Sequence, residues 1–119
     1  MGELKTGSEL VPVARQTGDA VIASIRGEID LHFSPELRTE ILDLLVKYQP
    51  KRLVLNLSDV RYMDSSAIAV LVEALQRVRK IGGRVFLTNL QPRVNGLLEI
   101  ARLGTLFVIC KDEAEALAK

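Results

Sequence analysis

The apolar residues of this 119-residue chain follow two spacings that alternate along its length. Short, nearly continuous apolar runs are typical of strands, whereas stretches in which apolar residues recur every three or four positions are typical of helices. The runs predict strands at Leu10–Ala14, Ala20–Ile25, Leu53–Leu57, Val85–Leu87 and Leu106–Ile109. The helical spacing predicts helices that start near Ser34, Ser65, Pro92 and Asp112.

The first two predicted strands form a hairpin. Pro12 excludes a central place in a sheet for the first of them, because proline cannot donate a ladder hydrogen bond. Thr17-Gly18-Asp19 is a turn signal between the two runs, so we expect an antiparallel pair at the edge of the sheet. Gly27-Glu28-Ile29-Asp30 is expected to leave the second strand and lead to the first helix. Residues 1–9 are expected to be a disordered lead-in to a domain over residues 10–119.

Capping and breaking residues delimit the helices. Ser34-Pro35-Glu36 predicts an N-cap, a first helical proline and an acid favoured by the helix dipole. The second helix has the clearest apolar stripe and stops at Gly82-Gly83. A third is expected from Pro92 to Gly104, although it includes the unfavourable pair Asn95-Gly96. Asp112, with Glu115 three residues on, predicts a terminal helix over Glu113–Ala118.

The order of these elements predicts an α/β domain. Because helices separate the buried strands after the opening hairpin, those strands are joined by right-handed crossovers and run parallel. We therefore expect one small mixed β-sheet, with an antiparallel edge hairpin and parallel strands, flanked by about four helices. A chain of 119 residues has the length of a single domain.

Composition excludes several classes of function. With 16 Lys+Arg, 15 Asp+Glu and no Trp, the chain has neither the basic field nor the stacking aromatics of a nucleic-acid-binding protein. One cysteine, Cys110, and one histidine, His32, cannot supply a disulfide or a multi-ligand metal centre, so we expect no metal and no cofactor. Cys110 closes a predicted strand and is expected to be inert. No apolar run approaches the ~20 residues needed to cross a bilayer, and the polar start is unlike a signal peptide, so we expect a cytoplasmic protein without membrane insertion.

The most informative segment follows the Leu53–Leu57 strand, because functional groups collect beyond the carboxyl ends of parallel strands. It is expected to be a loop that ends in Asp64-Ser65-Ser66 at the start of the clearest helix. One serine satisfies the helix N-cap, which leaves the other available for a different role. A phosphate is tolerated at a helix N-terminus, where free N–H groups and the dipole favour an anion. Beside Asp64 it would repel a partner with acidic groups opposite.

The stretch from Leu53 to Ser66 resembles the central motif of STAS domains, and specifically of bacterial anti-sigma factor antagonists. Gly27–Asp30, Ile81–Gly83 and Pro92–Gly104 agree in order, so the resemblance covers roughly residues 10–110. It implies a small mixed sheet with flanking helices. It also implies a binding protein, not an enzyme, that sequesters an anti-sigma factor with serine kinase activity and thereby frees a sigma factor.

The resemblance assigns roles to particular residues. The kinase would inactivate the antagonist by phosphorylating the hydroxyl that follows the aspartate, which is Ser65, and a PPM-type phosphatase would restore it. Asp30 and Asp64 would border this site in the partner interface, with Ser66 as the neighbour at the helix start. Family members often continue the motif as Gly-Leu-Gly, where this chain has Ala67-Ile68-Ala69.

Two alternatives stay open from the sequence. The alanines are compatible with a STAS subunit of a larger assembly, such as a stress-signalling scaffold or a lipid-transport complex, that phosphorylation does not switch. Asp30, His32 and Ser65 also include the residue types of a hydrolase triad, but no Gly-x-Ser-x-Gly elbow surrounds Ser65. The oligomeric state and the sigma factor served are not evident from the sequence.

Overall fold

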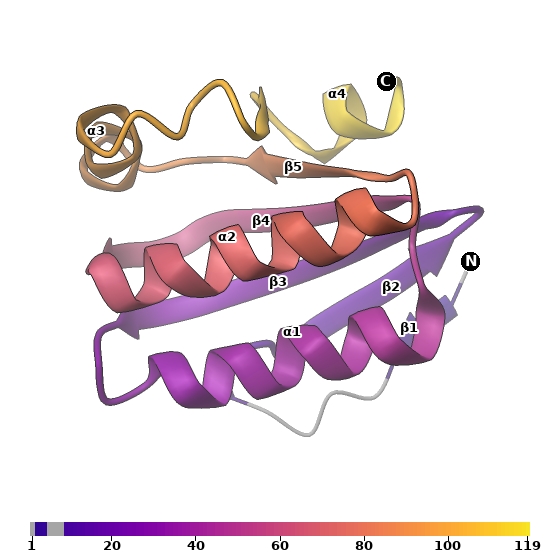
Figure 1. The fold of residues 1–119 in the computed structure, drawn as a ribbon, viewed down its shortest axis with the longest axis horizontal. Helices are drawn as coiled ribbons and strands as arrows, with labels where there is room; N and C mark the ends of the chain where they lie inside the picture. The colour runs from indigo at the N-terminus through magenta and orange to yellow at the C-terminus, as the bar shows by residue number, and fades with distance from the viewer. Residues whose placement is uncertain (1, 5–8) are drawn as a thin grey trace.

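The computed structural model describes residues 2–4 and 9–119, and for Glu3 the backbone alone. Over these residues the chain forms a six-stranded sheet and four helices (Figure 1). The strands are β1 (Gly2–Leu4), β2 (Val13–Thr17), β3 (Ala20–Ile29), β4 (Arg52–Met63), β5 (Arg84–Thr88) and β6 (Val108–Cys110). The helices are α1 (Ser34–Tyr48), α2 (Ser65–Lys80), α3 (Pro92–Ile100) and α4 (Glu113–Leu117).

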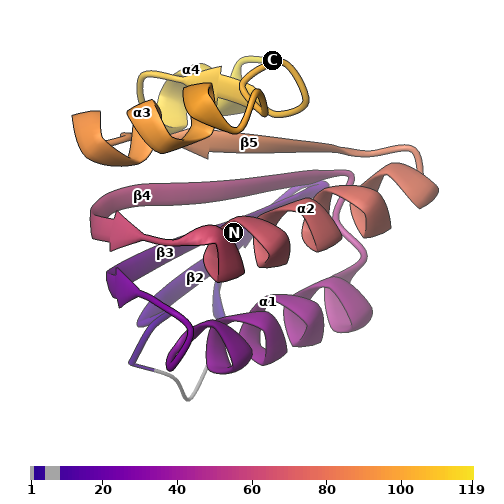
Figure 2. The ribbon, with the colours of Figure 1, turned by 60° about the vertical axis from the view of Figure 1, so that its left-hand side comes forward.

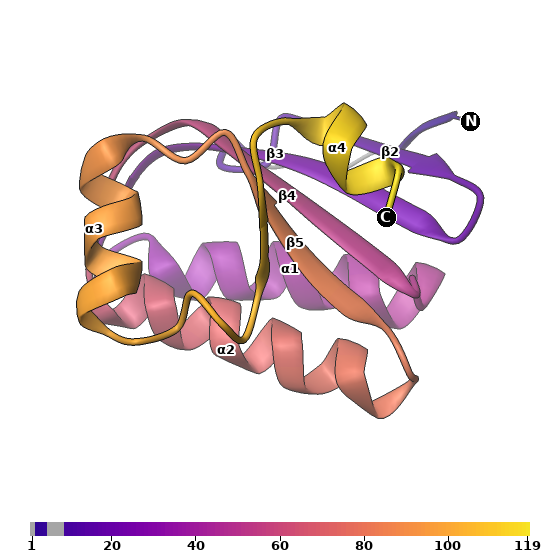
Figure 3. The same ribbon diagram turned by 90° about the horizontal axis from the view of Figure 1, so that it is seen from above.

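The sheet is mixed, as the sequence predicts. Its strand order is β1-β2-β3-β4-β5-β6, in which β2 is antiparallel to both β1 and β3, and β3, β4, β5 and β6 run parallel to one another. Because consecutive parallel strands are adjacent, the crossovers place α1 and α2 side by side on one face (Figure 2). The opposite face carries α4, and α3 lies beyond the end of β5 (Figure 3).

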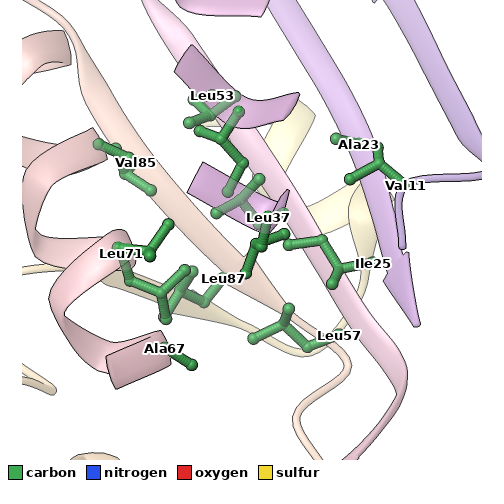
Figure 4. Packing of buried hydrophobic residues seen from close by; sticks show 14 of the residues in the cluster. Val11, Ala23, Ile25, Leu37, Leu53, Leu57, Ala67, Leu71, Val85 and Leu87 are labelled. Carbon is green, nitrogen blue, oxygen red and sulfur yellow. The ribbon is translucent and has the colours of Figure 1, made fainter. Parts of the chain in front are cut away.

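Two apolar clusters hold these layers together. The larger lies between the sheet and α1 and α2, where Leu37 and Leu71 pack against Leu53, Leu57 and their neighbours (Figure 4). The smaller lies under α4 and consists of Ile22, Val54, Phe86, Cys110 and Ala116. Successive strand side chains point to opposite faces, so β4 contributes Leu53 to one cluster and Val54 to the other.

The two central strands are longer than predicted, and this corrects the expected loop after Leu57. β4 continues to Met63 and β3 to Ile29, with Arg26 opposite Asp59 and Ile29 opposite Met63. The register shifts twice in this extension, and Gly27 adopts a φ of 103° at one of the irregularities. These bulges interrupt the apolar alternation, which is why the sequence pattern indicates a loop where the chain is still paired.

The N-terminal region also differs from the prediction. The first hairpin strand runs over Val13–Thr17 and not Leu10–Ala14, so Leu10 and Val11 are buried ahead of it. Gly2–Leu4 forms β1 along the outer edge of β2, and this corrects the expected disordered lead-in for those three residues. An edge strand offers unpaired backbone groups, and β1 satisfies some of those of β2. Residues 1 and 5–8 of the lead-in lie outside the described residues.

The helix ends agree with the sequence in part. The N-cap of α1 is Phe33, because Ser34 is already helical and buried. The third helix passes through Asn95-Gly96 but ends at Ile100, and β6 follows two residues later than predicted. The Asp112 side chain accepts a hydrogen bond from the Glu115 amide at the start of α4, which confirms the predicted cap.

Candidate functional site

The candidate site lies at the carboxyl ends of β3 and β4. Asp30 follows the last residue of β3 and Asp64 follows the last residue of β4, and those last residues are direct partners in the sheet. The Asp64 amide donates to the Ile29 carbonyl over 3.1 Å, which joins the two strand ends. The pairing therefore brings the Asp30 turn next to Asp64-Ser65-Ser66, as the sequence predicts for neighbouring parallel strands.

Asp64 is the N-cap of α2, which corrects the expectation that a serine has this role. Its Oδ1 accepts from the Ser66 amide at 2.9 Å, the Ser66 hydroxyl at 2.5 Å and the Ala67 amide at 3.3 Å. The Ser66 hydroxyl is the main reason that the pKa of Asp64 lies below its usual value, and amides that include that of Leu31 act in the same direction. Asp64 is thus held as a carboxylate.

The two serine hydroxyls are in different situations. The Ser66 hydroxyl is half-buried and donates to Asp64. Ser65 is the first residue of α2 and is exposed, and its hydroxyl has no hydrogen-bond partner among the described residues. Because Asp64 caps the helix and engages Ser66, Ser65 is the hydroxyl that is left free for chemistry.

Asp30 shapes the turn that leads into α1. Its Oδ1 accepts from the His32 amide at 2.9 Å and the Phe33 amide at 3.2 Å. Its carbonyl accepts from the Phe33 and Ser34 amides at 3.1 and 2.8 Å. Each predicted acid therefore organises the start of one helix, and the two together give this edge negative charge next to Ser65.

The two alanines that replace the family's glycines face different surroundings. Ala67 is fully buried and its methyl group points into the core (Figure 4). Ala69 is exposed, one helical turn after Ser65. Only the Ala69 methyl group therefore lies on the surface near Ser65.

The structure does not assemble a hydrolase triad. Asp30 bonds to the backbone of His32 and not to its ring. The His32 ring packs edge-on against Phe33, with ring centroids 4.7 Å apart. No contact joins the His32 ring to Ser65 in the part of the chain that the structure describes. The residue types that suggest this alternative are therefore near one another without the contacts that the chemistry requires.

The remaining chemistry-bearing groups give no second site. Cys110 is buried under α4, and burial is the main cause that raises the pKa of its thiol and so disfavours the reactive thiolate. Among residues 2–4 and 9–119, no three His, Cys, Asp or Glu side chains are grouped so that they could hold a metal ion. Over the same residues, no helix is long and apolar enough to span a membrane.

Sequence reasoning missed two features of the site. One is the capping role of Asp64, although aspartate before a helix is itself a cap signal. The other is Leu31, an apolar residue with a relative exposure of 73% in the turn between Asp30 and α1. Nothing in the local pattern distinguishes this leucine from a core residue.

Comparison with known proteins shows the family to which the chain belongs. The family model that describes the STAS domain matches residues 11–116. The chain belongs to the STAS domain family. A curated relative in this family, the anti-sigma-B factor antagonist of Bacillus subtilis (strain 168), is 35% identical over 95 residues, which cover 80% of this chain and 85% of the relative.

Solved structures share the STAS fold of this chain. An anti-sigma factor antagonist from Mycobacterium paratuberculosis matches with a TM-score of 0.79 at 22% identity, covering 88% of each chain. The anti-sigma factor antagonist SpoIIAA in its unphosphorylated form matches with a TM-score of 0.75 at 22% identity, over 87% of this chain and 90% of that one. The phosphorylated form of SpoIIAA, from Bacillus, matches with a TM-score of 0.68 at 22% identity, over 88% of this chain and 95% of that one. These likenesses confirm the α/β fold class.

Proposed function

We propose that this STAS protein is an anti-sigma factor antagonist that phosphorylation of Ser65 switches off. In its unphosphorylated form it binds and sequesters an anti-sigma factor that has serine kinase activity. The interface includes Asp30, Asp64, Ser65 and Ser66. The relatives that are named as anti-sigma factor antagonists support this function. One observation supports Ser65 as the modified residue: its hydroxyl is exposed and makes no hydrogen bond within the described part of the chain, because Asp64 caps α2 in its place.

The chemistry at Ser65 is a reversible phosphoryl transfer. The γ-phosphoryl group of ATP passes to Ser65 Oγ, the hydroxyl proton is released, and ADP leaves. A PPM-type phosphatase hydrolyses the ester, which returns the hydroxyl and releases inorganic phosphate. The antagonist is the substrate of both enzymes and the catalyst of neither. It acts as a binding module in the cytoplasm.

The position of Ser65 allows the switch to act without unfolding the domain. A phosphate at the first residue of α2 lies at the positive end of the helix dipole, which favours an anion. The cap is not lost, because Asp64 and not Ser65 accepts the bonds from the Ser66 and Ala67 amides. What changes is the surface, which gains roughly −1.5 to −2 charge beside an existing carboxylate.

A second candidate function is that of a STAS subunit in a larger assembly, which phosphorylation does not regulate. The exposed Ala69 methyl group favours this alternative, because it stands one turn from Ser65 on the surface that a kinase would approach. In that case the edge around Ser65 would be a permanent contact, and Ser65 would stay unmodified.

Intact-mass spectrometry with peptide mapping distinguishes the two functions. The protein is isolated from its own cells across growth and stress conditions, and the peptide over residues 62–77 is sequenced. We expect one phosphate on Ser65, its loss in Ser65→Ala and its retention in the matched Ser66→Ala variant. A chain that is unmodified under all conditions would favour the assembly subunit, and phosphate on Ser66 would show that the wrong hydroxyl was chosen.

A further inference from the structure

Leu31 is unusually exposed for its type and place. Its relative exposure of 73% is exceeded among the exposed large apolar residues of the described chain only by Ile100, which is the last residue of α3. Leu31 lies instead between the two acids of the candidate site. The Asp64 amide donates to the carbonyl of Ile29, two residues before Leu31, over 3.1 Å, so the turn with Leu31 lies next to the cap of α2.

The turn that carries Leu31 is held by several hydrogen bonds. The Asp30 carboxylate accepts hydrogen bonds from the amides of His32 and Phe33, which follow Leu31 in the chain. The Asp30 carbonyl accepts a hydrogen bond from the Ser34 amide. An apolar side chain on a fixed turn loses little backbone freedom when it is buried, so less of the binding free energy is spent on ordering it.

Acidic groups lie next to Leu31. Asp30 precedes it directly, and Asp64 follows the strand whose last residue pairs with Ile29. Ser65 follows Asp64. Such a surface fits a partner that offers an apolar pocket with N–H donors at its rim.

We propose that Leu31 is the apolar anchor of the partner interface and enters a pocket on the anti-sigma factor kinase. This inference rests on the proposed function and adds to it the residue that carries the affinity. It also changes the account of the switch, because a phosphate on Ser65 beside a buried Leu31 would have to lose its water. Burying a dianion is costly unless the partner pairs it, and a pocket shaped for an uncharged leucine offers no such pair.

A matched pair of variants tests the anchor. Leu31→Ala removes the proposed contact, and Val46→Ala makes the same kind of change at an aliphatic residue of 69% exposure near the other end of α1, about 20 Å away. The probe is the kinase that phosphorylates Ser65, purified and titrated calorimetrically with unphosphorylated protein in the absence of ATP. We expect Leu31→Ala to weaken binding about tenfold, Leu31→Met to restore most of it, and Val46→Ala to change it by less than twofold.

The outcomes separate the anchor from the proposed function. If the wild-type chain does not bind the kinase, the proposed function fails. If the wild-type chain binds and Leu31→Ala binds equally well, or if Val46→Ala weakens binding as much, the anchor is overturned and the function stands. Equal melting temperatures of the variants exclude unfolding as the cause, and with unequal values the Leu31→Gln variant replaces Leu31→Ala.

A salt series tests the coupling to phosphorylation. Charge repulsion between exposed groups is screened as salt rises, because the Debye length falls from about 10 Å at 0.1 M to about 3 Å at 1 M. Loss of water from a buried phosphate is not screened in this way. We expect the fold-loss of affinity on Ser65 phosphorylation to persist at 1 M salt, and a loss that disappears there would overturn this part of the inference.

Discussion

At the scale of single residues, Asp64 has two roles in this protein. Its carboxylate accepts three hydrogen bonds, from the amides of Ser66 and Ala67 and from the Ser66 hydroxyl. It thereby starts α2 and leaves Ser65 unengaged. A residue that the sequence indicates only as a neighbour of Ser65 is therefore also the group that organises the start of α2.

The pKa of Asp64 predicts a pH-dependent contribution to stability. This pKa lies below its ordinary value of 3.8, chiefly because the Ser66 hydroxyl bonds the charged form. A lowered folded-state pKa means that the contribution is complete above the ordinary value and is lost as the pH falls through the folded-state pKa. We expect Asp64→Ala to lower the melting temperature at pH 7, and the difference from wild type to shrink as the pH falls below 3.8.

Thermal unfolding of both proteins from pH 7 to pH 2.5, followed by circular dichroism, measures this difference. Asp59→Ala is the control, because Asp59 is exposed and lies on the same strand end without a capping role. A difference for Asp64→Ala that stays constant with pH would show that the charged form is not what stabilises the helix start.

Replacing each of the two alanines after the serines by glycine should affect stability and the phosphorylation rate differently. Ala67→Gly removes a buried methyl group and adds backbone freedom within a helix, so it should cost about 1–2 kcal/mol of unfolding free energy and leave Ser65 as accessible as before. Ala69→Gly should cost about 1 kcal/mol or less and raise kcat/KM for phosphorylation of Ser65. Urea unfolding and an initial-rate assay with the kinase measure both effects. Faster phosphorylation of Ala67→Gly alone would contradict the burial of that methyl group.

At the scale of elements, the sequence predicts what local chemistry decides. The α2 stripe, the Gly82-Gly83 stop and the Asp112 cap all appear where the pattern places them, because each depends on neighbours in the chain. The continuation of β4 to Met63 depends on pairing with β3 through two irregularities, and no local pattern encodes that pairing. The β1 strand likewise depends on the free edge of β2.

The candidate site also combines features that the local sequence predicts with features that depend on distant segments. Its residues are brought together because the ends of neighbouring parallel strands meet at one edge, which sequence alone predicts for Asp30 and Asp64. The cap of α2 is not predicted, since aspartate and serine are both common N-caps. The exposure of Leu31 is not evident from the local pattern, and its role, like that of Ser65, stays a prediction.

Two glycines in helix-related positions predict opposite effects on stability. A Cβ at Gly83 would lie 2.5 Å from the Lys51 carbonyl oxygen and 2.7 Å from Val78 Cγ1, so the α2–β5 connection requires the missing side chain. Gly83→Ala should cost about 1–3 kcal/mol through overpacking. A Cβ at Gly96 meets nothing within 4 Å inside α3, so Gly96→Ala should stabilise by about 0.5–1 kcal/mol. Chemical denaturation of the two variants checks this pair, and stabilisation by Gly83→Ala would contradict the close packing.

At the scale of the whole molecule, the net charge is only +1. Both signs are present at the carboxyl ends of the strands, where Asp30 and Asp64 follow β3 and β4 and Arg26 pairs opposite Asp59. A phosphate on Ser65 would add negative charge next to the two carboxylates, while the sheet and its helices stay as they are.

The central claim is that Ser65 phosphorylation abolishes partner binding, and the affinity of both forms for the kinase tests it most directly. The unphosphorylated protein and the protein phosphorylated on Ser65 are titrated calorimetrically into the purified kinase at one salt concentration. A phosphate that enters the interface without a pairing group costs several kcal/mol, so we predict an affinity at least about a hundredfold lower for the phosphorylated form. Equal affinities would contradict the account.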